Sequence, residues 1–282
     1  MTEEIINDPF PHSVNKKIFS KKIWQEINQN WPEKDFFETY ADGHNRTKKS
    51  PGRFGFYILG YSAEKFLNKL NMKNYKFWKS FSNFHLKKNI KKKFFSFLPY
   101  FRKRFEGVYD NLELQSFAVL VYTNKQIKVA IHTENPSVLM SGLIYKNNHL
   151  NDSCGTSIYR SLKQKKDSGV RFLNSNDFKI IRTFPFRDNF QFCFIKTNNS
   201  FHGVEKTSIK KGQERCSINW HIRLTDKSIE KIYKIKKFKD FARNNGVHEE
   251  KILYQLNKMQ SEKLDLQPPT NYEKLMIEKS FC

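Results

Sequence analysis

The chain has 282 residues, enough for one large or two small domains with an ample core, and no apolar run reaches the roughly 18 residues that a membrane-spanning helix needs. Its formal net charge of +23 invites contact with a polyanion, but the excess is spread along the chain, and abundant Lys, Asn, Ile and Phe favour a compositional origin. The four cysteines form no CxxC pair, and the first residues are acidic and polar. We therefore expect free thiols, no membrane segment and a cytoplasmic location.

The N-terminal part of the chain predicts helices that support the rest of the fold. Consecutive X-Pro steps make residues 8–12 an extended entry, and residues 15–30 carry apolar side chains at helical spacing. Residues 42–56 are polar and contain glycine, which predicts a loop. Residues 62–106 predict helices rich in lysine and aromatic residues, with a buried face formed by Phe77, Trp78, Phe81 and Phe84.

Short β-type runs begin near residue 111 and are separated by turn signals. The eight runs are 113–123, 126–133, 137–146, 155–159, 178–184, 190–197, 201–206 and 214–224. Short strands without intervening helical patterns predict a closed barrel or a jelly roll of the cupin type. We expect a mainly β fold in which 1–282 form a single domain: 1–110 as N-terminal helical support, 111–224 as the β core, and 225–282 as a C-terminal helical extension.

His132 and Glu134 stand two residues apart at the end of a predicted strand. Side chains at i and i+2 of a strand project to the same side, so an imidazole and a carboxylate can reach one ion. His202 follows 70 residues later (202 − 132), beside Gly203, which permits a close backbone approach to a ligand. Two imidazoles and one carboxylate form the facial triad that suits non-haem Fe(II) and O₂.

Arg215 and Ser217 lie on the last predicted strand and share one face of it. A guanidinium binds a carboxylate through two parallel hydrogen bonds, and a neighbouring hydroxyl adds one more. Each of these residues taken alone is more often an ordinary turn or surface residue. The order H-x-E, H, R-x-S in a row of short strands predicts a dicarboxylic acid held beside a metal.

The sequence resembles the 2-oxoglutarate- and Fe(II)-dependent oxygenases, on the branch nearer the prolyl hydroxylases. The resemblance covers roughly 111–224, and residues 9–30 resemble the entry and first helix of such enzymes with less specificity. The segment Ala130–Pro136 is similar to the family's H-T-D segment, and Leu139–Tyr145 to the strand that follows it. Cys154–Tyr159 resembles the G-T-x-x-Y step, and Phe184–Asn189 with Phe194–Val204 resembles the approach to the distal histidine.

The resemblance implies a double-stranded β-helix with flanking helices, and it implies roles for individual residues. His132, Glu134 and His202 would bind Fe(II), and Arg215, assisted by Ser217, would bind the distal carboxylate of 2-oxoglutarate. The remaining implied contacts of the co-substrate pocket are Tyr122 and Thr156. Glu134 stands where most members have Asp, and its carboxylate, which halogenating relatives lack, favours hydroxylation. The implied reaction consumes O₂, converts 2-oxoglutarate to succinate and CO₂, and hydroxylates an aliphatic C–H bond of a small-molecule, sugar or peptidyl substrate.

Two other interpretations stay open. One is a nucleic-acid dealkylating oxygenase, which the charge supports, although relatives of that kind usually carry a denser arginine pattern than Arg215 and Arg223, eight residues apart. The other is a non-catalytic, basic, cupin-like binding protein in which the histidines are incidental. The sequence names no substrate and no oligomeric state. We expect specificity to reside in the N-terminal helices and in the loop 160–177, which we interpret as a lid.

Overall fold

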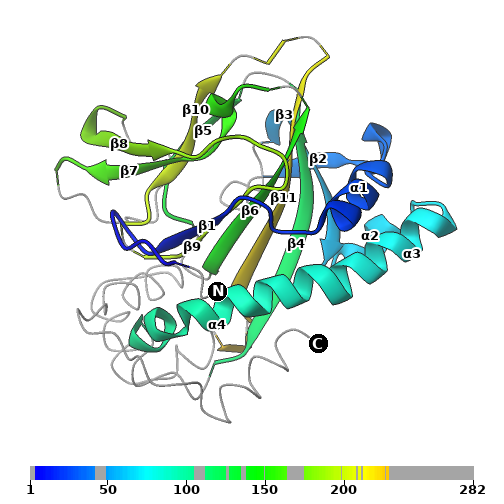
Figure 1. Cartoon of the computed structure of the whole chain (residues 1–282), viewed down its shortest axis with the longest axis horizontal. Helices are drawn as coiled ribbons and strands as arrows, with labels where there is room; N and C mark the ends of the chain where they lie inside the picture. Colours follow the sequence, from blue (N-terminus) through cyan, green and yellow to red (C-terminus); the bar gives the residue numbers. More distant parts are fainter. Residues whose placement is uncertain are drawn as a thin grey trace.

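Two antiparallel sheets form the centre of the molecule (Figure 1). The seven-stranded sheet has the order β1-β9-β6-β11-β4-β3-β2, and the four-stranded sheet has the order β5-β10-β7-β8. From β4 to β11 the chain alternates between the two sheets, except that β7 and β8 pair with each other. This topology is a double-stranded β-helix, or jelly roll, so the expected mainly β fold is confirmed.

The computed structural model describes residues 4–41, 49–104, 112–124, 127–134, 138–148, 150–163, 175–197, 199–207, 209–210, 212–225 and 227–228. Its strands are β1 (His12–Asn15), β2 (Glu38–Ala41), β3 (Lys49–Leu59), β4 (Leu114–Thr123), β5 (Ile127–His132), β6 (Val138–Asn148), β7 (Ser157–Ser161), β8 (Phe178–Thr183), β9 (Gln191–Ile195), β10 (His202–Thr207) and β11 (Glu214–Leu224). Its helices are α1 (Lys21–Gln29), α2 (Ala63–Leu67), α3 (Met72–Ser80), a π-helix (Phe81–Leu86) and α4 (Lys87–Arg104). Nearly all of the predicted C-terminal extension, and residues 164–174 of the predicted lid, lie outside these ranges.

All eight predicted β runs are strands, but the loop predicted over 42–56 is wrong from residue 49 onward. Residues 49–59 form β3, which pairs with β4 on one side and β2 on the other. Pro51, Gly52 and Gly55 disfavour a strand locally, and the two neighbouring strands override that preference. Residues 42–48 lie outside the described part of the chain.

The helix predicted over 15–30 begins later, at Lys21. Residues 12–15 form β1 instead, paired antiparallel with β9. The hydroxyl of Ser20 accepts a hydrogen bond from the N–H of Ile23 (3.4 Å), which caps the first turn of α1. The extended entry predicted for residues 8–12 therefore continues into the edge of the large sheet.

The helices pack on the outer face of the large sheet and form one hydrophobic core with it. Trp78 and Phe81 are buried there as predicted, and Phe77 is partly buried against them. Phe84 is 69% exposed, so its predicted place in the core is wrong; the π-turn between α3 and α4 changes the helical spacing. Among the described helices, none has the length and apolar character required to cross a membrane.

Strand β11 divides its side chains between the two faces of the large sheet. Alternate residues Cys216, Ile218, Trp220 and Ile222 lie in the core beneath the helices. Arg215, Ser217, Asn219 and His221 project to the opposite side, toward the smaller sheet. Gly142 of β6 pairs with Trp220, and a Cβ at this glycine would lie 2.1 Å from the indole ring. A side chain at position 142 would therefore displace β11 from the position that presents its polar residues to the site.

Candidate metal centre

The two histidines of the predicted triad meet because β5 and β10 are neighbours in the smaller sheet. His132 ends β5, His202 begins β10, and the antiparallel register pairs the two residues directly. Directly paired residues project to the same face, and the two ring centroids lie 4.3 Å apart. Gly203 allows a close approach, as predicted, but to the main chain of β5 rather than to a ligand: a Cβ there would lie 2.6 Å from the carbonyl oxygen of Val129.

Glu134 lies close to the two imidazoles, but it does not belong to the same strand as His132, although the sequence predicts that it does. The strand stops at His132, and Glu134 adopts a left-handed backbone conformation with φ of 51° instead of continuing the strand. Its Oε1 lies 3.5 Å from Nε2 of His202. One potential ligand atom from each of the three residues falls within 4.8 Å of the others, so the cluster could hold a metal ion.

Main-chain carbonyls orient both imidazole rings. Nδ1 of His132 lies 2.8 Å from the carbonyl oxygen of Ala130, and Nδ1 of His202 lies 2.9 Å from that of Ser200. A carbonyl only accepts hydrogen bonds, so each Nδ1 carries the proton. Each Nε2 is then the unprotonated nitrogen that a metal ion requires.

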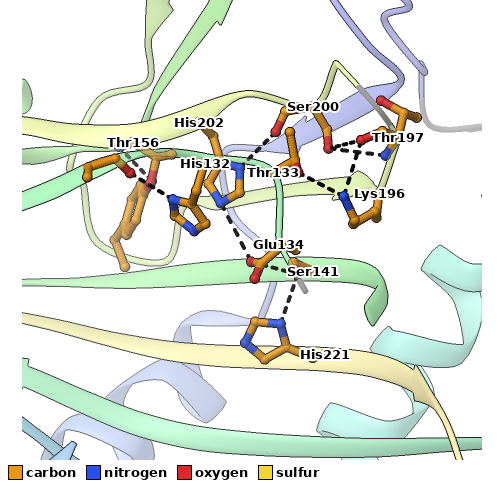
Figure 2. Close-up of polar contacts among 12 residues, drawn as sticks. His132, Thr133, Glu134, Ser141, Thr156, Lys196, Thr197, Ser200, His202 and His221 are labelled. Carbon is orange, nitrogen blue, oxygen red and sulfur yellow. Dashed lines mark hydrogen bonds and ion pairs between the residues drawn. The ribbon is translucent and has the colours of Figure 1, made fainter. Parts of the chain in front are cut away.

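The carboxylate of Glu134 is held in its ionised form within this largely buried cluster (Figure 2). Burial alone would raise its pKa, but the close approach of His202 and the nearby His221 and His132 bring the pKa well below its ordinary value. Ser141 Oγ donates to Glu134 Oε1 (3.1 Å) and lies 2.8 Å from Nδ1 of His221. Ser141 of β6 thus holds the carboxylate by a hydrogen bond, and His221 of β11 in turn contacts Ser141.

A buried lysine contacts the segment that joins His132 to Glu134. Lys196 has no exposed surface, and its ammonium donates to the hydroxyl of Thr133 (2.8 Å) and lies 3.5 Å from the carbonyl oxygen of Thr197 (Figure 2). Because Thr133 is the residue between the two ligands, this contact ties the left-handed turn at Glu134 to the end of β9. Sequence reasoning missed this residue, since a lysine in a basic chain is usually exposed.

Arg215 is buried on the face of β11 that points toward the smaller sheet. Its Nε donates to the carbonyl of Cys154 (2.9 Å), and its guanidinium carbon lies 5.5 and 5.2 Å from the ring centres of Tyr145 and Phe186. The side chain is 4% exposed, and its Nη2 has no hydrogen-bond partner in the described part of the chain. Burial lowers the pKa of this guanidinium. A buried cation with an unused donor is costly, and a bound carboxylate would supply the missing acceptor.

Polar groups gather beside Arg215. Ser217, on the same face of β11, donates to Asn219 Oδ1 (2.8 Å). Tyr145 pairs with Ser217 across the sheet, and its hydroxyl donates to Thr156 Oγ1 (2.8 Å) and accepts from the N–H of Thr156 (3.0 Å). Ser217 and Thr156 therefore lie in the Arg215 region, together with Tyr145, for which the sequence predicts only a place in a strand.

Tyr122 is not brought to this region. It pairs directly with Cys216, so its side chain lies on the helix-covered face of the large sheet, opposite to Arg215. There it stacks on Phe54 (4.8 Å between ring centroids) and meets Phe37 edge-on. The residue of β4 that lies across from Arg215 is Thr123. The predicted contact of Tyr122 with the co-substrate pocket is therefore corrected.

No protein-family model matches the sequence, and no curated protein matches it. The solved structures that are similar to this chain include prolyl hydroxylases and other 2-oxoglutarate-dependent enzymes. A prolyl hydroxylase from Trichoplax adhaerens, in complex with a peptide of the hypoxia-inducible factor oxygen degradation domain, is 12% identical, with a TM-score of 0.47, over 77% of this chain and 85% of that chain.

Two further solved structures are similar over comparable lengths. A prolyl-4-hydroxylase from Pseudomonas putida is 12% identical, with a TM-score of 0.37, over 75% of this chain and 91% of that chain. HygX from Streptomyces hygroscopicus, with nickel and 2-oxoglutarate bound, is 10% identical, with a TM-score of 0.39, over 76% of this chain and 83% of that chain. Identities and scores this low transfer no residue role, so the roles proposed below rest on the geometry of this chain.

Proposed function

We propose that the chain is a 2-oxoglutarate- and Fe(II)-dependent dioxygenase that hydroxylates an aliphatic C–H bond of a small-molecule, sugar or peptidyl substrate. The observation that carries the proposal is the His132–Glu134–His202 cluster, in which both Nδ1 protons are bound by main-chain carbonyls. Within the described residues the cluster has three members. Three ligands that leave coordination positions open suit non-haem Fe(II), whereas a structural zinc site is usually closed by a fourth protein ligand.

Arg215 supports 2-oxoglutarate as the co-substrate. The unused Nη2 is buried beside the rings of Tyr145 and Phe186, where a carboxylate would meet a preformed cation. In this proposal Ser217 assists Arg215, and Thr156 lines the pocket through its contact with Tyr145. The opposite end of the same 2-oxo acid would then reach the metal.

The protein residues have three tasks in the proposed reaction. Bound Fe(II) would supply the activation of O₂ and the coordination of the 2-oxo acid. Ala130 and Ser200 keep the proton on Nδ1 of each histidine, so that both Nε2 atoms stay available. Ser141 holds the Glu134 carboxylate in place, and the aromatic core between the sheets excludes water from the reacting groups.

We also propose that the helices and the β core act as one catalytic unit over 1–282, in a reducing, cytoplasmic compartment. The shared hydrophobic core of helices and large sheet supports the first point for the described residues. Cys154, Cys193 and Cys216 are buried free thiols, which supports the second.

Succinate formation tests the proposed activity. Purified protein with Fe(II), 2-oxoglutarate and O₂ should release succinate slowly without added substrate, and faster when a substrate is present. The His132→Ala protein should release none, while His85→Ala, which changes an exposed histidine of the π-helix, should match the wild type. Succinate release that does not depend on Fe(II), or that survives in His132→Ala, would contradict the assignment.

The net charge of +23 favours a nucleic acid as a second candidate for the substrate. Oligonucleotide affinity that falls steeply with salt, together with succinate release stimulated by an alkylated oligonucleotide, would support this candidate. Succinate release stimulated by small molecules or peptides and not by nucleic acid would exclude it.

A further inference from the structure

A cavity with a volume of about 340 Å³ lies on the helix-covered side of the large sheet. It is lined by the end of β3, the start of α2, the π-helix and the start of β4. Ser116 of β4, which lines it, pairs directly with Ile222, whose side chain lies in the core beneath the helices. The cavity and the metal centre are therefore on opposite faces of the same sheet. Its size falls at the lower end of the range for small-molecule sites.

One polar group in the lining of this cavity is buried without a partner. Ser82 is 2% exposed, and its hydroxyl makes no hydrogen bond in the described part of the chain. A serine inside a helix usually donates to a carbonyl one turn earlier, and a buried hydroxyl left without a partner is costly. Ser82 lies in the π-helix, an irregularity that frequently occurs at functional sites. A ligand that accepts a hydrogen bond from this hydroxyl would satisfy it.

The charges of the cavity favour an anion. Lys79 and Lys87 both line it, on either side of the π-helix. Lys79 is paired with Glu64, which also lines the cavity, whereas Lys87 has no ion-pair partner among the described residues. Asn83 adds an amide donor between the two lysines. One ammonium group is therefore available to a ligand, within a chain of strong positive charge.

The lining also holds an apolar part. Ile58 and Leu67 line the cavity from β3 and α2, and Tyr61 lines it with 83% of its surface exposed. The cations here are lysines, compact charges that commonly bind phosphate, and not arginines, whose planar fork matches carboxylates. We propose that this cavity binds a phosphate monoester with an apolar body: Lys87 and Ser82 bind the phosphate, and Ile58, Leu67 and Tyr61 contact the body.

Calorimetric titration of the full-length protein with phenyl phosphate tests this site. One molecule should bind per chain, and both inorganic phosphate and phenol should bind more weakly, because each lacks half of the contacts. Lys87→Ala should lower the affinity for phenyl phosphate by about tenfold to a hundredfold, the usual effect of losing a hydrogen bond to a charged group. Lys88→Ala is the matched control, since this neighbouring lysine is exposed and does not line the cavity.

Two further variants make the outcome decisive. Arg215→Met should leave the binding of phenyl phosphate intact, because Arg215 faces the other side of the sheet; loss of binding there would place the ligand in the interior site and overturn the proposal. Ser82→Ala should weaken binding severalfold. Unchanged affinity in Ser82→Ala, or equal losses in Lys87→Ala and Lys88→Ala, would overturn the proposal. Either result would show that phenyl phosphate is attracted only by the general positive charge of the surface. Absence of any binding to the wild type would also overturn the proposal.

Discussion

Replacement of Arg215 by methionine separates the binding of a dicarboxylic acid from the binding of iron. Methionine fills much of the space beside Tyr145 and Phe186 but removes the Nη2 donor that has no partner in the described chain. A hydrogen bond to a charged group contributes roughly 1.5–3 kcal/mol, so losing the two bonds of a bidentate pair costs roughly 3–6 kcal/mol. Since each 1.4 kcal/mol is about tenfold in affinity, 2-oxoglutarate should bind about a hundredfold to ten-thousandfold more weakly.

The matched probe for this variant is pyruvate, which has the 2-oxo acid group but no distal carboxylate. Anaerobic titration of the Fe(II)-loaded protein, followed by its visible absorption, measures the affinity for each acid. Arg215→Met should weaken 2-oxoglutarate strongly and leave pyruvate and Fe(II) nearly unchanged. Equal losses for both acids, or no loss for either, would show that Arg215 does not bind the distal carboxylate.

Three further predictions concern the contact between Thr133 and Lys196, the length of the Glu134 side chain, and the buried thiol of Cys216. Thr133→Val keeps the side-chain volume but removes the acceptor of Lys196, so Fe(II) binding in a chelator competition should weaken by about tenfold. Lys196→Met should have a similar effect, and the double variant should lose no more than either alone; fully additive losses would contradict a shared contact. Glu134→Asp withdraws the carboxylate by about 1.5 Å, one C–C bond, and should weaken Fe(II) binding about tenfold to a hundredfold unless the turn moves with it. Burial raises the pKa of the Cys216 thiol from its ordinary value of 9.0 to about 12. A pKa that is higher in the folded chain than in the unfolded chain means that this thiol's contribution to stability is complete below about pH 9 and is lost as the pH rises toward 12. Denaturant unfolding between pH 8 and pH 10.5 should therefore show a smaller loss of stability in Cys216→Ala than in the wild type, and identical profiles would contradict the shift.

The β core could be predicted because each strand is an apolar run bounded by residues that favour turns. Strand β3 could not, since Pro51, Gly52 and Gly55 are typical of a loop, and its pairing with β4 and β2 depends on contacts far apart in the sequence. The later start of α1 has a similar cause: residues 12–15 pair with β9, nearly 180 positions along the chain.

The histidines, the carboxylate and the arginine could be found as a pattern of residue types, but their supporting contacts could not. Whether Tyr122 or Thr123 faces Arg215 depends on the register of β4 against β11, and a shift of one residue exchanges the faces. The left-handed turn that carries Glu134 has no local signal in a non-glycine residue. Lys196 looks like one of many surface lysines until the fold buries it.

The most direct test of the iron and 2-oxo acid site is an anaerobic titration of the purified protein with Fe(II) and 2-oxoglutarate, followed by visible absorption. The wild type should develop the charge-transfer band of a 2-oxo acid bound to Fe(II), with one iron per chain, and His202→Ala should develop none, while the exposed-site control His85→Ala should behave as the wild type. A wild-type protein that gives no band with both components in excess, or a band that persists in His202→Ala, would contradict the proposed metal centre.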